Sequence, residues 1–286
     1  MPKTYNDLYL DGRRVLMQAG IEAAALEARE LLCYAADKDK DSFYRDSRLY
    51  AGGDVEERFR ELLERRVEGE PAAYLIGEWE FYGIPLDINR SVIVPRSDTE
   101  LIAERAIELA DQAGEGCRVL DLCTGSGCIG LAVAKHVPKA RVVLADLSEE
   151  ALHVARSNAR RNELLRRVVC VRADALKPPP NALLGAFDVI VSNPPYIPSG
   201  DIPGLDRSVR DFEPHSALDG GRDGLDFYRS ITEFWKDALR PGGALIFEVG
   251  FDQADPVEQL MAQQGYHDID TRLDTQNIWR LVEGRL

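Results

Sequence analysis

The chain has 286 residues, a length that suits two domains better than one. Hydrophobic residues make up 45% and charged residues 29%, and no apolar run approaches the roughly 18–20 residues needed to span a bilayer. The formal net charge of −14 argues against a stand-alone nucleic-acid binder, because such binding depends on lysine and arginine side chains that neutralise phosphates.

The first part of the chain is predicted to be helical. Thr4 and Asp7 have the spacing of a capping pair, and Ile21–Ala36 is rich in residues that favour helices. Asp54 with Glu57 predicts the start of a further helix. Four apolar residues of that helix are expected on one face: Phe59, Leu62, Leu63 and Val67. We therefore predict a small helical bundle.

A change of pattern follows the helices. Trp79–Ile88 alternates apolar and polar residues and is rich in aromatics, which predicts a β-hairpin within a connector over residues 74–95. Ser97 and Glu100 then have the spacing of a capping box for a helix that runs through Leu109.

The remainder of the chain alternates apolar runs with helix-like segments. This pattern predicts a doubly wound, mostly parallel sheet with helices on both faces, and the last two runs leave no room for a helix between them, so they form an antiparallel hairpin. The seven predicted strands are Val119–Leu122, Val142–Ala145, Val168–Val171, Val189–Val191, Ala244–Val249, Asp268–Leu273 and Ile278–Val282. The predicted domains are 1–73, the linker 74–95, and 96–286.

A glycine-rich turn follows the first of these strands. Gly125, Gly127 and Gly130 fit the spacing G-x-G-x-x-G, in which the backbone turns tightly and a ligand approaches its N–H groups. Asp146 ends the next strand, where a carboxylate can hold both ribose hydroxyls of an adenosine, and Asp174 follows the third strand. A tight turn without any ligand has the same pattern, and these residues suit a nicotinamide dinucleotide as well as S-adenosylmethionine.

The segment Asn193–Tyr196, with the sequence Asn-Pro-Pro-Tyr, favours the second cofactor. It follows the fourth strand, which we expect beside the first, where ligands bind in doubly wound sheets. The prolines hold the backbone extended, so that the Asn193 side chain and the Pro194 carbonyl can aim two acceptors at one planar NH2 group. Tyr196 can lie against that planar group. The alternative is a simple Asn-Pro turn.

No metal site is predicted. The five cysteines form no Cys-x-x-Cys pair, and the four histidines are scattered. The N-terminal sequence Met1–Asn6 is polar and lacks the apolar core of a signal peptide, so we expect a cytoplasmic protein with no membrane contact.

With these motifs, the chain resembles the family of peptide chain release factor N(5)-glutamine methyltransferases, called PrmC or HemK. Asn-Pro-Pro-Tyr after a glycine-loop core is typical of methyltransferases that act on planar nitrogens, in DNA bases or in glutamine. Three further stretches resemble this family in particular, and with the helical N-terminal part the resemblance spans essentially the whole chain: Pro71–Tyr82, Val94–Glu100 and Glu213–Gly224.

The resemblance implies a Rossmann-like S-adenosylmethionine methyltransferase core, joined by a β-hairpin linker to a helical domain that docks class I release factors. The substrate is then the glutamine of their Gly-Gly-Gln motif, and we expect a monomer that does not bind nucleic acid directly. Asn193, Pro194, Pro195 and Tyr196 are the implied catalytic residues. The implied cofactor-binding residues are Asp121, Cys123, Thr124, Gly125, Ser126, Gly127, Asp146, Asp174, Ala175 and Asn193.

Within this set, Asp146 is expected to bind the cofactor ribose, and residues 123–127 to surround its methionine end. Asp174 and Ala175 are expected to border the adenine. The chain departs from the family at two of these positions. Cys123 stands where the family often has glycine, and Ala175 stands where an aromatic residue sometimes follows the acid.

Two other functions share some of these features. A DNA adenine N6-methyltransferase has both motifs, but it usually adds a basic DNA-docking surface, whereas residues 1–80 contain 12 lysines and arginines against 18 aspartates and glutamates. A nicotinamide-dependent dehydrogenase fits the glycine loop and leaves Asn-Pro-Pro-Tyr unexplained.

Overall fold

The computed structural model describes residues 2–185 and 187–286, which form two compact units. The first unit contains the chain up to Glu78 together with the separate segment Asp206–Phe212. The second contains Trp79–Leu205 and Glu213–Leu286.

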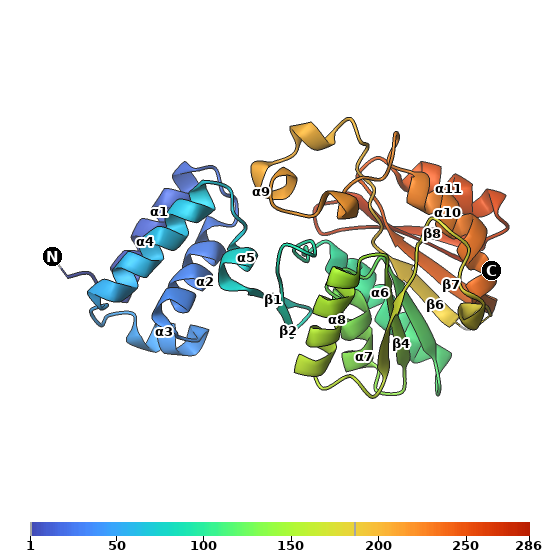
Figure 1. The fold of residues 1–286 in the computed structure, drawn as a ribbon, viewed down its shortest axis with the longest axis horizontal. Helices are drawn as coiled ribbons and strands as arrows, with labels where there is room; N and C mark the ends of the chain where they lie inside the picture. The colour runs from blue at the N-terminus through green and yellow to red at the C-terminus, as the bar shows by residue number, and fades with distance from the viewer. Residues whose placement is uncertain (1, 186) are drawn as a thin grey trace. The chain divides into compact units, whose positions relative to one another are not determined.

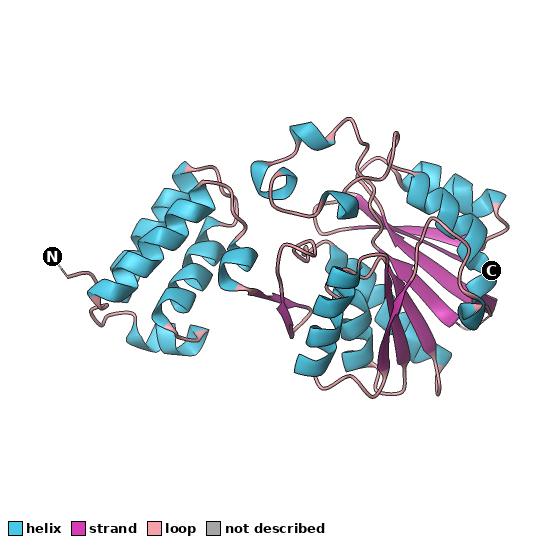
Figure 2. Ribbon diagram, viewed as in Figure 1, coloured by secondary structure: helices cyan, strands magenta, loops and turns pink. Residues whose placement is uncertain are grey.

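The first unit is helical, as predicted (Figures 1 and 2). The Thr4–Asp7 capping pair is confirmed, because the Thr4 hydroxyl accepts the Asp7 N–H and the Asp7 carboxylate accepts the Thr4 N–H. Leu16, Leu31 and Phe59 are buried in its core. Its helices are α1 (Tyr5–Gln18), α2 (Ala24–Ala36), α3 (Lys40–Asp46), α4 (Gly53–Val67), α5 (Ala72–Ile76) and α9 (Arg207–Arg210).

Helix α4 starts where it was predicted, to within one residue, but two of its details differ from expectation. Gly52 is the N-cap, with an extended backbone and no side-chain cap, so Asp54 lies inside the first turn instead of capping it. A carboxylate there still interacts favourably with the helix dipole. Phe59, Leu62 and Leu63 form the buried face, but Val67, in the last turn, is 45% exposed.

The predicted β-hairpin is confirmed in β1 (Glu78–Phe81) and β2 (Ile84–Asp87). Its two turn residues, Tyr82 and Gly83, both have positive φ, at 47° and 73°. Two-residue hairpin turns of this kind match the right-handed twist of the strands.

Helix α6 (Thr99–Ala113) begins and ends differently from the prediction. Asp98 is the N-cap and makes no side-chain cap, so the expected Ser97–Glu100 capping box is wrong. The Glu100 carboxylate instead accepts the Tyr82 N–H of the hairpin turn at 3.1 Å. The helix also continues four residues past Leu109, and Ala110 is the last of its residues that is buried.

The second unit is built on a seven-stranded sheet in the order β5-β4-β3-β6-β7-β9-β8. Neighbouring strands are parallel except for β9, which runs antiparallel to both β7 and β8, so the predicted doubly wound sheet with a terminal hairpin is confirmed. The strands are β3 (Arg118–Leu122), β4 (Arg141–Asp146), β5 (Val168–Arg172), β6 (Phe187–Ser192), β7 (Leu239–Glu248), β8 (His267–Leu273) and β9 (Trp279–Arg285).

Helices cover both faces of this sheet (Figure 1). One face carries α6, α7 (Cys128–His136) and α8 (Glu149–Arg161), and the other carries α10 (Asp226–Phe234) and α11 (Ala254–Gln263). Short 3-10 turns connect them: Asn181–Leu183, Ile202–Gly204, His215–Ala217 and Trp235–Ala238.

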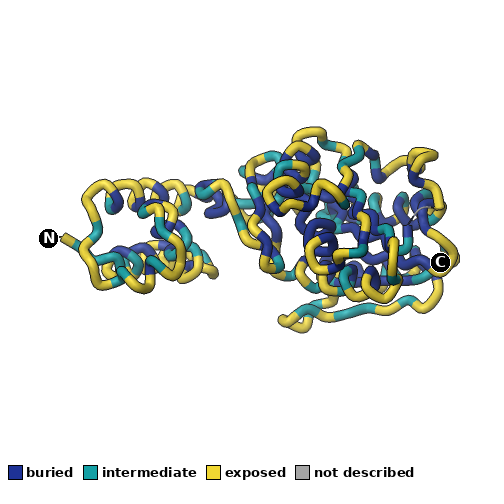
Figure 3. Tube along the Cα trace, turned by 90° about the horizontal axis from the view of Figure 1, so that it is seen from below, coloured by how far each residue is buried: buried dark blue, intermediate teal, exposed yellow. Residues whose placement is uncertain are grey.

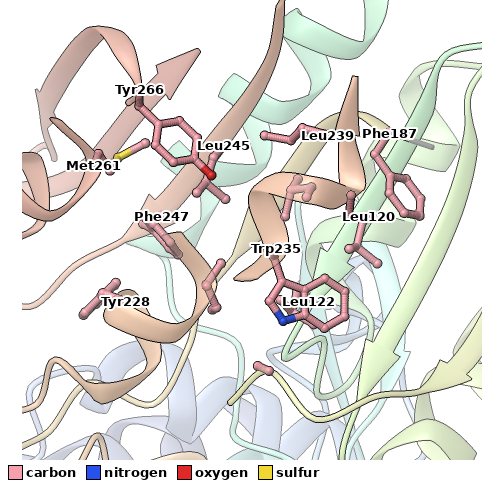
Figure 4. Close-up of a cluster of buried hydrophobic side chains, with 14 of the residues drawn as sticks. Leu120, Leu122, Phe187, Tyr228, Trp235, Leu239, Leu245, Phe247, Met261 and Tyr266 are labelled. Carbon is pink, nitrogen blue, oxygen red and sulfur yellow. The ribbon is translucent and has the colours of Figure 1, made fainter. Parts of the chain in front are cut away.

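Side chains that alternate along β3 point to opposite faces and fill two layers of core. Leu120 and Leu122 lie in a buried cluster with Tyr228, Trp235 and Met261 of the α10–α11 side (Figure 4). Buried residues lie mainly in the interior of each unit and exposed residues on its outside (Figure 3). No helix in the described ranges is both long and apolar enough to cross a membrane.

On the other face of β3, helix α7 packs very close to the strand at Gly130. A substitution of this glycine can test that packing. A Cβ at Gly130 would lie 2.3 Å from Leu144 Cδ2 and 3.0 Å from Asp121 Cβ, both of them buried residues. Gly130→Ala is therefore expected to destabilise the protein by about 1–3 kcal/mol in urea unfolding. Gly200→Ala, in the same unit with open space at its Cβ, is the matched control and should change stability by less than about 0.5 kcal/mol. Equal stability of the two variants would contradict this packing argument.

Candidate functional site

The two predicted motifs meet where the strand order of the sheet reverses. β3 lies between β4 and β6, and the register pairs Leu122 with Ser192, the last residues of β3 and β6. The Ser192 hydroxyl donates to the Leu122 carbonyl at 2.7 Å and ties these strand ends together. The glycine-rich turn and the Asn193–Tyr196 segment therefore leave the sheet side by side, where ligands bind in doubly wound folds.

The turn after β3 requires unusual backbone angles. Cys123 has φ +62° and Gly127, the N-cap of α7, has φ +85°. The Thr124 N–H donates to the Ala145 carbonyl of β4 at 3.0 Å and fixes the turn. Because a positive φ favours glycine, a glycine would fit position 123 with less backbone strain than a cysteine does. Burial raises the pKa of the Cys123 thiol, which stays neutral.

Asp121 is a fully buried acid beneath this turn. Its Oδ2 accepts the Thr124 hydroxyl at 2.6 Å and the Gly130 N–H at 2.8 Å, whereas Oδ1 has no partner among the described residues. Burial raises the pKa of Asp121 to about 7, although both hydrogen bonds oppose the shift. A buried acceptor left without a partner fits a cationic ligand group, and the ammonium of S-adenosylmethionine is such a group.

Asp146, the last residue of β4, links the turn to the next helix. One of its oxygens accepts the Gly125 N–H and the other the Ser148 N–H, both at 2.9 Å. Burial raises the pKa of Asp146, which these two bonds partly counteract. An ionised carboxylate has about four lone-pair sites, so this half-buried side chain can still accept two ribose hydroxyls.

The remaining residues predicted for the cofactor differ in accessibility. Asp174 follows β5 at the same edge of the sheet, where it accepts the Leu176 N–H at 3.0 Å and pairs with Lys177 at 3.0 Å. Ala175 is buried in the core cluster. Ser126 is buried as well, and its carbonyl accepts the Asn158 side-chain amide. The side chains of Ala175 and Ser126 are therefore not open to a ligand unless the site rearranges.

The segment after β6 holds a half-exposed asparagine on buried prolines. Pro194 and Pro195 are buried, and Asn193 is partly accessible. The Asn193 Nδ2 group donates to the Thr99 hydroxyl of α6 at 3.4 Å, a long hydrogen bond. This contact uses the nitrogen end of the amide and leaves Oδ1 as the acceptor that the side chain can offer to a substrate.

Contacts that the sequence did not indicate hold Tyr196 in place. Its carbonyl accepts the Gln253 side-chain amide at 2.9 Å. Gly224 comes so close that a Cβ there would lie 2.3 Å from the same carbonyl oxygen, and Gly220 approaches Pro195 in the same way. The stretch Glu213–Gly224 was known from the sequence only as a family resemblance, whereas here it packs against the Pro-Tyr backbone.

Glu248, the last residue of β7, is a second fully buried acid in this region. Burial raises the pKa of Glu248 to about 7, although the positive charges of Arg280 and Arg96 oppose the shift, and its Oε2 has no partner among the described residues. The sequence predicted a site residue in Asp146, an acid that ends a strand, whereas Glu248 ends its strand in the same way and was not predicted. The described residues contain no group of three or more histidines, cysteines or acids that could hold a metal ion.

Comparison with known proteins assigns both parts of the chain. Residues 7–77 match the family described as the PrmC N-terminal domain, and residues 100–202 match the methyltransferase small domain. The release factor glutamine methyltransferase of Geobacter sulfurreducens is 40% identical over 96% of this chain and 94% of its own length. That of Bradyrhizobium diazoefficiens is 41% identical over 94% of this chain and 91% of its own length.

A solved structure supports the fold assignment. A methyltransferase from Pyrococcus furiosus has a TM-score of 0.51 and 20% identity, and the match covers 78% of this chain and 96% of that one.

The contact between Gln253 and Tyr196 can be tested directly. Gln253→Ala leaves the Tyr196 carbonyl without its donor, so we expect a loss of about 1–3 kcal/mol in unfolding free energy. Gln259→Ala changes an exposed glutamine of α11 and should leave stability unchanged within about 0.5 kcal/mol. Chemical denaturation of both variants measures the difference. Equal stability of the two variants would show that the hydrogen bond between Gln253 and Tyr196 does not stabilise the fold.

Proposed function

The chain belongs to the family of release factor glutamine methyltransferases, and we propose that it methylates the side-chain amide nitrogen of the Gly-Gly-Gln glutamine in class I peptide chain release factors. The observation that carries this proposal is the near-full-length similarity to such enzymes together with Asn193–Tyr196 beside the glycine-rich turn. A DNA adenine methyltransferase would share the second feature but is not what the full-length relatives are named.

S-adenosylmethionine is the proposed cofactor, and when bound it supplies a methyl group carried by a positively charged sulfur. The free Oδ1 of Asp121 fits the ammonium of its methionine end, and the backbone of residues 123–127 lies above this acid. Asp146 is proposed to accept the ribose hydroxyls. Asp174 and the Ala175 backbone are left to border the adenine, because the Ala175 methyl lies in the core.

Asn193 and Pro194 are proposed to orient the substrate amide. A glutamine nitrogen is a poor nucleophile, because its lone pair is delocalised into the carbonyl. If the Asn193 Oδ1 and the Pro194 carbonyl accept its two N–H groups, the amide is fixed in place and electron density on its nitrogen rises. Both bonds strengthen as positive charge develops on that nitrogen, so they stabilise the transition state more than the bound substrate. Pro195 fixes the backbone, and Tyr196 lies against the amide plane.

The helical domain, residues 1–73, is proposed to dock the release factor, with 74–95 as a linker to the methyltransferase domain at 96–286. The match to the PrmC N-terminal domain supports this assignment. We propose that the enzyme acts as a monomer in the cytoplasm and needs no direct contact with nucleic acid.

Replacing Asn193 tests the proposed chemistry. Asn193→Ala removes one of the two acceptors, and we expect kcat to fall by on the order of a hundredfold to a thousandfold. Asn193→Asp should also impair activity, because a carboxylate changes both the charge and the hydrogen-bond pattern. Mass spectrometry of the Gly-Gly-Gln peptide, after incubation of a class I release factor with enzyme and S-adenosylmethionine, measures the transfer of one methyl group.

The control is Asn181→Ala, an exposed asparagine of the second unit, which should keep full activity. Full activity of Asn193→Ala would contradict the assigned role. If wild-type enzyme leaves the release factor unmodified and methylates adenine in duplex DNA in a parallel assay, the alternative function is supported.

The raised pKa of Asp121 predicts how cofactor binding depends on pH. An acid with a pKa of about 7 loses its charge as the pH falls, and with it the attraction for an ammonium group. The dissociation constant for S-adenosylmethionine should therefore rise about eightfold between about pH 7.5 and about pH 6. Calorimetry measures this change.

Asp121→Asn should weaken binding on the order of tenfold and remove the pH dependence. Asp188→Asn changes an acid near the opposite end of the sheet, where it pairs with Arg240, and should keep the wild-type profile. An Asp121→Asn variant with unchanged affinity and an unchanged pH profile would rule out the ammonium contact.

A further inference from the structure

Asn158 is a fully buried polar side chain that the proposed reaction does not use. It lies in the last turn of α8, beside strand β2 of the hairpin (Figure 1). Its Oδ1 accepts the Asp87 N–H at 2.6 Å, and its Nδ2 group donates to the Asp87 carbonyl at 3.1 Å and to the Ser126 carbonyl at 2.9 Å. Asp87 ends β2, and Ser126 lies in the glycine-rich turn. One amide therefore joins the hairpin to the proposed cofactor site.

These three contacts allow the Asn158 amide one orientation. A side-chain amide has two hydrogens to donate on its nitrogen, and it accepts at its oxygen. The two carbonyls need the NH2 group and the Asp87 N–H needs the oxygen, so both hydrogens are in use. If β2 separates from α8, the amide loses two of the three contacts that decide its orientation and is free to turn away from Ser126.

The contact with Ser126 fixes the peptide bond that leads into α7. On one side of this bond the Ser126 carbonyl accepts from Asn158, and on the other the Gly127 N–H donates to the Thr124 carbonyl at 2.8 Å. A trans peptide is planar and its two polar groups point in opposite directions, so these contacts hold the plane from both sides. The Thr124 hydroxyl in turn donates to Oδ2 of Asp121, the acid proposed to meet the ammonium group of the cofactor. A continuous line of hydrogen bonds therefore runs from the hairpin to this acid.

The turn needs such support because its backbone is strained. Cys123 has φ +62°, a conformation that costs free energy in residues other than glycine and persists where the surroundings fix it. Asp146 of β4 holds the first half of the turn through the Gly125 N–H at 2.9 Å. Asn158 holds the second half through Ser126. The geometry of the turn, and with it the affinity for a ligand there, therefore depends on the contact between α8 and the hairpin.

We propose that Asn158 is a positioning residue that couples the hairpin to the cofactor turn, so that S-adenosylmethionine binds more tightly when β2 is in place on α8. This inference rests on the cofactor site proposed above. Coupling between two sites is reciprocal, so bound cofactor also holds β2 against α8. The hairpin begins at Glu78, where the first part of the helical unit ends. Cofactor binding therefore stabilises the segment that connects the proposed docking domain to the methyltransferase domain.

A neighbouring asparagine provides a matched control. Asn162, the C-cap of α8, is buried, and its Nδ2 group donates to the Pro85 carbonyl of β2 at 2.9 Å and to the Asn158 carbonyl at 3.0 Å. These two carbonyls lie in the hairpin and in α8, and neither lies in the glycine-rich turn. Replacing Asn162 therefore weakens the same hairpin anchor but keeps the contact between Asn158 and Ser126.

Calorimetric titration with S-adenosylmethionine tests the first direction of the coupling. Asn158→Ala leaves the Ser126 carbonyl without its donor, so we expect the dissociation constant to rise on the order of tenfold. Asn158→Asp keeps the shape of the side chain but gives up both N–H donors, and it should weaken binding to a similar extent. Asn162→Ala should lower stability and change the dissociation constant by less than about twofold. Equal dissociation constants in Asn158→Ala and Asn162→Ala would overturn the proposal.

Hydrogen exchange tests the reverse direction, first in the wild-type protein, where no substitution disturbs folding. Saturating S-adenosylmethionine should slow exchange of the β1 and β2 amides by the same factor, on the order of tenfold, because coupling is reciprocal. Asn162→Ala should respond to the cofactor in the same way, whereas hairpin exchange in Asn158→Ala should not respond. Hairpin exchange that is unchanged by saturating cofactor in the wild-type protein would refute the coupling. Neither measurement needs a release factor, so both decide the coupling even if the release factor is not methylated.

Discussion

The meeting of β3 and β6 is the constraint on which the rest of the site depends. After β5, at one edge of the sheet, the chain crosses over to form β6 on the other side of β3. The ends of β3 and β6 therefore lie next to each other, and the segments that follow them diverge. The Ser192–Leu122 hydrogen bond fixes that junction. Local chemistry then forms the two motifs of the site: a turn with positive φ on one side and a proline-stiffened segment on the other.

Three acids end or nearly end the strands around this junction, at Asp121, Asp146 and Glu248. The pKa of each is raised by burial, which means that the folded protein tolerates a carboxylate where its charge is poorly solvated. Few hydrogen bonds offset this loss of solvation. One carboxylate oxygen of Asp121 and one of Glu248 have no hydrogen-bond partner among the described residues. Such unsatisfied groups cost stability, so their presence at the ligand edge of the sheet is better explained by function than by folding.

The sequence was sufficient for elements whose signal is local and repeated. Seven apolar runs predicted the strands, and the alternation around Trp79 predicted the hairpin, since burial on one or both faces leaves a pattern in the residues themselves. The helix starts were less predictable. Ser97 and Glu100 have the right spacing for a capping box, but Glu100 bonds the hairpin turn at Tyr82, a tertiary contact that competes with the local one.

The contrast between local patterns and tertiary contacts also explains which residues of the site could be predicted from the sequence. Asn193–Tyr196 and the glycine turn are contiguous motifs, and their place in the sheet follows from strand order. Thr99 and Gln253 come from two separate parts of the chain, and their contacts arise only when folding brings them against residues 193–196. A motif therefore identifies the atoms that are proposed to meet the substrate, whereas residues that are distant in the sequence, such as Thr99 and Gln253, contact those atoms in the folded protein. For an asparagine, whose two ends differ only in hydrogen-bond direction, the orientation of the amide decides whether the side chain accepts from the substrate or opposes it.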